Sequence, residues 1–229
     1  MLSNPFWLAL RTEHQGFAIG ESGVLRYPAD VIPFAGLENA SAEHLVALCR
    51  LMAPREELFI VAPDHLPEVD DLVQVGELPG LQLHFERSPP ARDIRVIAEL
   101  GIRRLGPEYA REMLSLTEVA FPGFFRERTY RLGAYFGIFH EDNLVAMAGE
   151  RIAIPGMREI SAVCTHPAHT GKGYATALIH HMLRFHAENG LGRFLHVAAE
   201  NDRALRLYQH LGFAVTASVC FRHLQRIER

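Results

Sequence analysis

Two glycines one residue apart, Gly171 and Gly173, lie between a strand pattern and a helix pattern. Glycine adopts positive φ without steric cost and lets backbone amides come close to a ligand. The first N–H groups of a helix have no partner inside the helix, and they carry the positive end of its dipole. Such a turn is suited to a phosphate or a pyrophosphate. Two glycines alone fit an ordinary strand-to-helix turn equally well, because short motifs also occur by chance.

Two common phosphate-binding motifs do not fit this turn. A Walker A loop requires a glycine five residues before Gly171 and a hydroxyl residue after Lys172, but His166 and Gly173 occupy these positions. The dinucleotide fingerprint requires glycine or alanine where Thr176 stands, and it belongs to an alternating βαβ series that the sequence pattern does not show. Any phosphate ligand of this turn must therefore belong to another class.

Residues 144–213 resemble the GNAT family of acyl-CoA-dependent N-acyltransferases in two separate blocks. The family hallmark Q/R-x-x-G-x-G/A aligns with residues 168–173, which read A-H-T-G-K-G. The second block, N-x-x-A-x-x-L-Y-x-x-x-G-F, matches residues 201–213 at every signature position. Two matched blocks are far more specific than one, and the likeness extends over roughly residues 105–229. Residues 147–165 further resemble a bacterial subgroup of the family.

The resemblance implies a fold, a cofactor and a set of site residues. The fold class is α/β (α+β), with a mixed, mostly antiparallel central sheet flanked by helices, and the cofactor is acetyl-CoA. Main-chain groups of residues 163–165 would hold the pantetheine arm, and the amides of residues 170–175 would hold the pyrophosphate. Asn201 would hydrogen-bond the cofactor arm, and Tyr208 would protonate the leaving thiolate. The implied cofactor-binding residues are Val163, Cys164, Thr165, His169, Thr170, Gly171, Lys172, Gly173, Tyr174, Ala175, Thr176, Asn201 and Tyr208.

The reaction also needs a base, because an amine attacks a thioester only in its neutral form. At pH 7 about one alkylammonium in a thousand is neutral when the pKa is near 10.4. A base must therefore collect the proton, directly or through water. Glu150 and Glu159 lie on adjacent predicted strands and are the candidate bases. The alternative is that both are ordinary solvated or salt-bridged strand residues.

Several of these residues also have a structural interpretation. Tyr208 lies on the apolar face of a short helix, where a tyrosine by itself is more often a core residue. Asn201 is a natural N-cap, a role that is compatible with cofactor binding. Cys164 lies beside the implied thioester, which suggests an acyl-cysteine intermediate, but a small buried filler is the favoured interpretation.

We expect no metal site. The spacing C-x-H-x-x-H over residues 164–169 has no fourth ligand at a recognised distance, and no H-E-x-x-H motif occurs. Three phenylalanines follow the first helix of the second half and either line the acceptor pocket or belong to the core. They are Phe121, Phe124 and Phe125.

One position departs from the family hallmark, because Ala168 stands where the family has glutamine or arginine. A hydrogen bond that involves a charged group contributes on the order of 1.5–3 kcal/mol, so its loss weakens binding about tenfold or more. Lys172, the single lysine of the chain, can supply a point charge instead. We therefore expect weaker cofactor binding, not its loss.

The first half of the chain is rich in proline, glycine and short apolar runs, whereas the second half has clearer helix and strand patterns. We expect an N-terminal accessory domain over residues 1–90 and a GNAT domain over residues 91–229. The first half is either a degenerate half of the same fold or a substrate-selecting domain. Residues 87–92 are the best linker candidate. Strand patterns occur at residues 7–10, 16–19, 23–27, 58–62, 81–85, 135–139, 144–152, 159–165, 194–199 and 213–221. Helix patterns begin near residues 41, 107, 175 and 202.

Composition narrows the functional class. The 229 residues are 48% hydrophobic and carry a net charge of −4, which disfavours nucleic-acid binding through a basic face. Three scattered cysteines and the lack of a signal-like or membrane-spanning apolar run favour the cytoplasm. The expected function is acetyl transfer from acetyl-CoA to an unidentified amine acceptor, with a homodimer left open. The alternatives are a non-catalytic acyl-CoA sensor and a structural, partner-binding protein.

Overall fold

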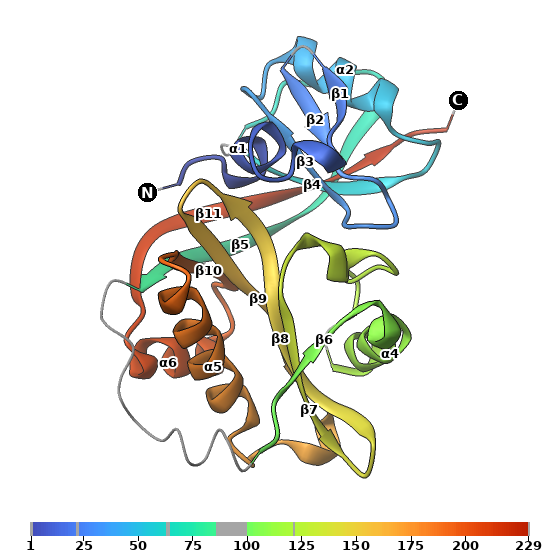
Figure 1. Ribbon diagram of the computed structural model, residues 1–229. Helices are drawn as coiled ribbons and strands as arrows, with labels where there is room; N and C mark the ends of the chain where they lie inside the picture. Colours follow the sequence, from blue (N-terminus) through green and yellow to red (C-terminus); the bar gives the residue numbers. More distant parts are fainter. Residues whose placement is uncertain (1, 22, 63–64, 86–99, 121, 229) are drawn as a thin grey trace.

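The computed structural model describes residues 2–21, 23–62, 65–85, 100–120 and 122–228. These residues form a mixed α/β structure around one large, mostly antiparallel sheet with helices against its faces (Figure 1). The eleven strands lie in the order β1-β2-β3-β4-β11-β5-β10-β9-β8-β7-β6. Among the described strands, only the pairs β3–β4 and β9–β10 are parallel. The fold class that the resemblance implies is confirmed.

The first half of the chain supplies the strands at one end of the sheet. Its elements are α1 (Pro5–Arg11), η1 (Gln15–Phe17), β1 (Ile19–Glu21), β2 (Val24–Arg26), β3 (Phe34–Leu37), α2 (Ala42–Leu51), β4 (Glu57–Val61) and β5 (Leu72–Phe85). The helix expected from residue 41 is confirmed, because the Ser41 hydroxyl accepts a hydrogen bond from the amide of His44 and caps α2. The strands expected at residues 23–27 and 58–62 correspond to β2 and β4.

The strand predicted at residues 7–10 is wrong, because these residues lie in helix α1. The side chain of Asn4 accepts a hydrogen bond from the amide of Trp7, and Pro5 follows in the first turn. An asparagine cap followed by proline is a helix-start signal that outweighs a short apolar run. The strand predicted at residues 16–19 is also mostly wrong, since η1 occupies residues 15–17.

The second half agrees closely with the sequence patterns. Its elements are β6 (Arg103–Leu105), η2 (Pro107–Tyr109), α4 (Ala110–Ala120), η3 (Thr129–Leu132), β7 (Tyr135–His140), β8 (Asn143–Ile154), β9 (Met157–Thr165), η4 (Pro167–His169), α5 (Tyr174–Glu188), β10 (Gly192–Ala198), α6 (Asp202–Leu211) and β11 (Ala214–Arg226). In the described part of the chain, no helix has both the length and the apolar character that crossing a bilayer requires.

Helices α4 and α5 cover opposite faces of the sheet. Consecutive residues of a strand point to opposite faces, and on β8 the residues Ala146 and Ala148 pack in the cluster with α5, whereas Met147 packs in the cluster with α4. Helix α6 contributes Tyr208 to the same cluster as α5. A residue of β8 therefore packs against α5 or against α4, depending on the face of the sheet to which its side chain points.

Strand β5 connects the two halves of the chain. It pairs antiparallel with β10 through residues 80–85 and with β11 along most of its length (Figure 1). Strand β11 in turn pairs with β4. The sheet thus passes without a break from one half to the other. The division near residue 90 stays a prediction, and the expected linker at residues 87–92 lies outside the described residues.

The sheet opens between β9 and β10. These parallel strands pair only over Gly192–Phe194 of β10 and Met157–Glu159 of β9, as the register Gly192↔Met157, Arg193↔Arg158 and Phe194↔Glu159 shows. Beyond Glu159 and Phe194 the two strands part, although each keeps its other neighbour. The main chain of residues 160–165 of β9 therefore borders an opening in the sheet.

Candidate functional site

The turn that follows β9 has the backbone geometry expected of a phosphate cradle. Gly171 and Gly173 adopt φ angles of +79° and +77°, in the left-handed region that favours glycine. A Cβ at either position would meet no atom within 4 Å, so the space beside both Cα atoms is open. Gly173 is the N-cap of α5, and no side chain caps this helix. The first N–H groups of a 15-residue helix are thus available to an anion.

Basic and imidazole side chains surround the cradle. The Lys172 ammonium nitrogen lies 3.5 Å from Nδ1 of His169. The His169 ring lies 5.0 Å from the ring of His140 and 5.8 Å from that of His166, centroid to centroid. Desolvation, with Lys172 and the two histidines, lowers the pKa of His169. The Lys172 side chain therefore lies beside the His169 ring at the exposed side of the turn.

A β-bulge in β9 precedes the cradle. On β8, Met147 pairs with Cys164 of β9 and Gly149 pairs with Ser161. The one β8 residue between them, Ala148, therefore lies opposite two β9 residues, Ala162 and Val163. Ala162, one of those two, has a φ of +50°. A non-glycine residue with this backbone conformation carries strain on the order of 1–3 kcal/mol, and such residues cluster at functional sites. The sequence carried no signal for it.

The other predicted cofactor residues flank this bulge and the cradle. Val163, Cys164 and Thr165 complete β9, whereas Tyr174, Ala175 and Thr176 begin α5. Cys164 lies on the face covered by α4, and burial raises the pKa of its thiol to about 12. A thiol with this pKa stays protonated at neutral pH, which favours the structural interpretation of Cys164 over an acyl-cysteine.

Helix α6 presents the residues of the second sequence block. Asn201 caps the helix, since its side-chain oxygen accepts a hydrogen bond of 3.0 Å from the amide of Ala204. Tyr208 is 9% exposed and packs edge-on against Phe213. Burial, and then the charge of Glu159, raise the pKa of Tyr208 to about 12. Its phenol therefore keeps its proton at neutral pH and can donate it.

The two predicted bases lie on adjacent strands but face opposite sides of the sheet. Glu150 pairs with Ile160, which packs against α5, so Glu159 points to the other face. The Glu150 carboxylate accepts a hydrogen bond from the Ala134 amide at 2.8 Å, and its Oε1 lies 2.6 Å from Nε2 of the buried His186. The structure therefore does not bring the two carboxylates together.

Glu159 is fully buried in an ion pair. Arg151 donates to both carboxylate oxygens of Glu159, from Nε at 2.9 Å and from Nη2 at 2.5 Å. His196 lies 2.8 Å away through Nδ1. Burial alone would raise the pKa of Glu159, but Arg151 and His196 lower it to about 2. At neutral pH this carboxyl is a carboxylate and a weak proton acceptor.

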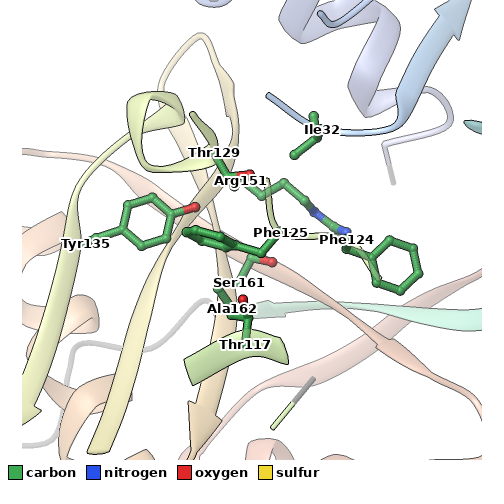
Figure 2. Close-up of a pocket in the computed structure, with 9 residues that line it drawn as sticks. All are labelled: Ile32, Thr117, Phe124, Phe125, Thr129, Tyr135, Arg151, Ser161 and Ala162. Carbon is green, nitrogen blue, oxygen red and sulfur yellow. The ribbon is translucent and has the colours of Figure 1, made fainter. Parts of the chain in front are cut away.

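A pocket lies on the α4 side, against the bulge of β9 (Figure 2). It spans about 360 Å³, part of which is open to solvent. Nine residues line it: Ile32, Thr117, Phe124, Phe125, Thr129, Tyr135, Arg151, Ser161 and Ala162. Phe124 and Phe125 line this pocket and also pack in or against the core, so both interpretations apply to them; Phe121 lies outside the described residues. The remaining lining residues come from six different segments, so no local pattern could have found them.

The described residues contain no group of three or more histidine, cysteine, aspartate or glutamate side chains that could hold a metal ion. The cradle, the bulge and the opening between β9 and β10 belong to an α/β fold in which a turn with the geometry suited to an anion lies at the edge of a split sheet. The pocket adjoins this arrangement from the α4 side.

Comparisons with known proteins then identify the family. Residues 102–213 match the sequence model of the acetyltransferase (GNAT) family, so this part of the chain is a GNAT acetyltransferase domain. A crystal structure of a protein assigned to the GNAT acetyltransferases, from Novosphingobium aromaticivorans, superimposes with a TM-score of 0.89 at 28% identity, over 99% of this chain and 98% of that chain. A GCN5-related N-acetyltransferase from Kribbella flavida has a TM-score of 0.60 at 15% identity, over 97% and 96% of the two chains, and shows the shared fold. Among curated proteins, none matches this chain.

Proposed function

We propose that the protein transfers an acetyl group from acetyl-CoA directly to an amine. The observation that carries this proposal is the coincidence of the cradle at Gly171 and Gly173 with the bulge at Ala162 and the opening beside β9. Family membership over residues 102–213 supports acyl transfer. The three free cysteines agree with the reducing cytoplasm as its setting.

The cofactor roles follow from this arrangement. Bound acetyl-CoA supplies the thioester whose carbonyl the amine attacks. The amides of residues 170–175 bind the pyrophosphate, and the Lys172 ammonium adds a positive charge at the exposed side. The main chain of residues 163–165 hydrogen-bonds the pantetheine arm along the opening, as a neighbouring strand would. Asn201 keeps its capping role and borders the arm.

Tyr208 is the proposed acid. When the C–S bond breaks, the thiolate needs a proton, and a neutral phenol near it can donate one. The burial that raises the pKa of Tyr208 to about 12 keeps the phenol protonated until that step. Among the described residues, its hydroxyl has no hydrogen-bond partner, so it is free to meet the sulfur.

The two candidate bases differ in their surroundings. Glu159 faces Arg151, which holds it as a carboxylate, and we assign it the task of positioning that arginine. Glu150 is paired with an imidazole instead, since its Oε1 lies 2.6 Å from Nε2 of His186. Because the Glu150 carboxylate lies on the α5 face, it would collect the amine proton through water.

A thermal-shift titration tests the proposal. Acetyl-CoA at 100 times its Kd should stabilise the protein by ~2.7 kcal/mol, and free CoA should also stabilise it. Thiol release with an amine acceptor then separates catalysis from binding. No shift with either compound would contradict the proposal.

A second candidate function is a non-catalytic acyl-CoA sensor. It is favoured by Ala168, where the family hallmark has glutamine or arginine. A sensor would shift in melting temperature with acetyl-CoA and would release no thiol with any amine. A purely structural protein would respond to neither measurement.

A further inference from the structure

The pocket against the bulge of β9 has an uneven lining. Among the described residues that form it, Arg151 is the single charged one. Its walls are otherwise apolar or aromatic, as in Ile32, Phe124 and Phe125, with hydroxyl groups between them (Figure 2). A molecule that fits this pocket must therefore offer an apolar body and a group that pairs with a guanidinium.

Arg151 is fixed in place by its neighbours. Its Nε and Nη2 both donate to Glu159, and its guanidinium lies over the rings of Phe6 and Phe34, at 5.6 Å and 5.2 Å from their centroids. Nη1 has no hydrogen-bond acceptor among the described residues, and the side chain keeps 17% of its surface exposed. Guanidinium groups with one free edge bind carboxylates well. Arg151 thus presents a prepositioned donor to the pocket.

The same lining disfavours a polycationic acceptor. Taking a second ammonium out of water is costly unless a carboxylate meets it. Among the described lining residues there is no acidic side chain, and Glu159 is already paired with Arg151. The net charge of the whole chain, −4, says little about this local field.

The first half of the chain shapes the pocket wall. Ile32 lines it directly, and Phe124 packs against Phe34 and Phe59, with ring centroids 5.9 Å and 5.2 Å apart. The space between these residues is partly open to solvent. The apolar body of an acceptor would therefore meet walls from both halves of the chain.

We propose that the acceptor is an amino acid with an apolar or aromatic side chain, whose carboxylate pairs with Nη1 of Arg151. This inference rests on the proposed acetyl transfer. The amine then lies toward Ser161 and Ala162, where the bulge borders the opening in the sheet. Attack of the neutral amine on the thioester carbonyl forms the amide and breaks the C–S bond. The amine proton leaves to water, and Tyr208 protonates the thiolate.

The test compares matched amines on the unmodified full-length protein. Thiol release from acetyl-CoA is measured with L-phenylalanine and L-leucine, with their decarboxylated counterparts 2-phenylethylamine and 3-methylbutylamine, and with spermidine. We expect kcat/KM to be tenfold or more higher for each amino acid than for its counterpart, because a charged hydrogen bond is lost. Equal or faster turnover of the counterparts, or a preference for spermidine, overturns this inference and leaves acetyl transfer intact. No thiol release with any amine, together with no thermal shift by acetyl-CoA, overturns both.

A substitution locates the effect at Arg151. Arg151→Lys keeps a positive charge beside Glu159 but loses the free guanidinium edge. We expect the KM for L-phenylalanine to rise severalfold or more with little change in kcat, and the kinetics of 2-phenylethylamine to stay the same. Arg104→Lys, an exposed arginine outside this pocket, is the matched control and should change neither. An unchanged preference in Arg151→Lys contradicts the inference, and if that variant does not fold, the matched amines decide alone.

Discussion

Replacing Glu159 by glutamine removes the negative charge that faces the buried guanidinium of Arg151. The pKa of Glu159 is lowered from 4.5 to about 2 in the folded protein, which at about 1.36 kcal/mol per pKa unit corresponds to roughly 3 kcal/mol of stability. Because the folded pKa is the lower one, this contribution is fully present above pH 4.5 and is lost as the pH falls toward 2. Removing one partner of a buried pair typically costs about 3–5 kcal/mol, in agreement with that figure.

Urea unfolding at a series of pH values measures this effect. At pH 7 the Glu159→Gln protein should be less stable than the native protein by about 3 kcal/mol. The difference should shrink between pH 4.5 and pH 2, since the native carboxyl becomes protonated there. Glu57→Gln, a half-exposed strand carboxylate paired with His223, is a control that should change stability by less than about 1 kcal/mol. Equal stability of Glu159→Gln and native protein at pH 7 would refute the assignment of a stabilising ion pair.

Four further predictions follow from the site and the sheet. Tyr208→Phe should lower kcat about a hundredfold or more and leave the thermal shift by acetyl-CoA unchanged, because only proton donation is lost. Gly173→Ala should cost about 1 kcal/mol through its positive φ and weaken acetyl-CoA binding, whereas Gly190→Ala, at the other end of α5 with a φ of +68°, should cost the same and leave binding intact. Ala168→Arg should tighten acetyl-CoA binding about tenfold in a direct titration. A fragment of residues 91–229 should fail to give a cooperative thermal transition, because it lacks β5 between β10 and β11.

Elements with strong local signals could be predicted from the sequence. Asn201 and Gly212 bound helix α6, and both act through bonds or angles within a few residues of the chain. The positive φ of Gly171 and Gly173 is likewise a local property that the hallmark encodes. Signals of this range do not depend on the rest of the fold, which explains why the second half agreed so closely with its patterns.

Local sequence patterns predict only the second part of strand β5. Only residues 81–85 gave a strand signal, because their alternation reflects burial beside β10. Residues 72–79 are mostly exposed and include Gly76 and Pro79, which weaken a strand pattern; they owe their strand conformation to pairing with β11. That pairing joins segments more than a hundred residues apart, and no short motif specifies it.

The two glutamates illustrate the same limit at the level of chemistry. The sequence correctly set Glu150 and Glu159 on adjacent strands, which left the register open. The bulge at Ala162 and the irregular pairing between Glu150 and Ala153 fix that register. A shift of one residue reverses the face of a side chain. Whether a carboxylate meets an arginine or an imidazole therefore depends on geometry that spacing does not contain.

The donor and acceptor sides of the site draw on different parts of the chain. The residues proposed to bind the donor lie in β9, the turn, and helices α5 and α6, which are close in sequence and carry the two recognisable blocks. The pocket proposed for the acceptor combines Ile32, five residues between positions 117 and 135, Arg151, and Ser161 and Ala162 of β9. Substitutions in the first half of the chain can therefore reshape the acceptor pocket without touching the cofactor blocks. For this reason the sequence can indicate acetyl-CoA as the donor, whereas the acceptor can be inferred only from the pocket that distant segments form in the folded protein.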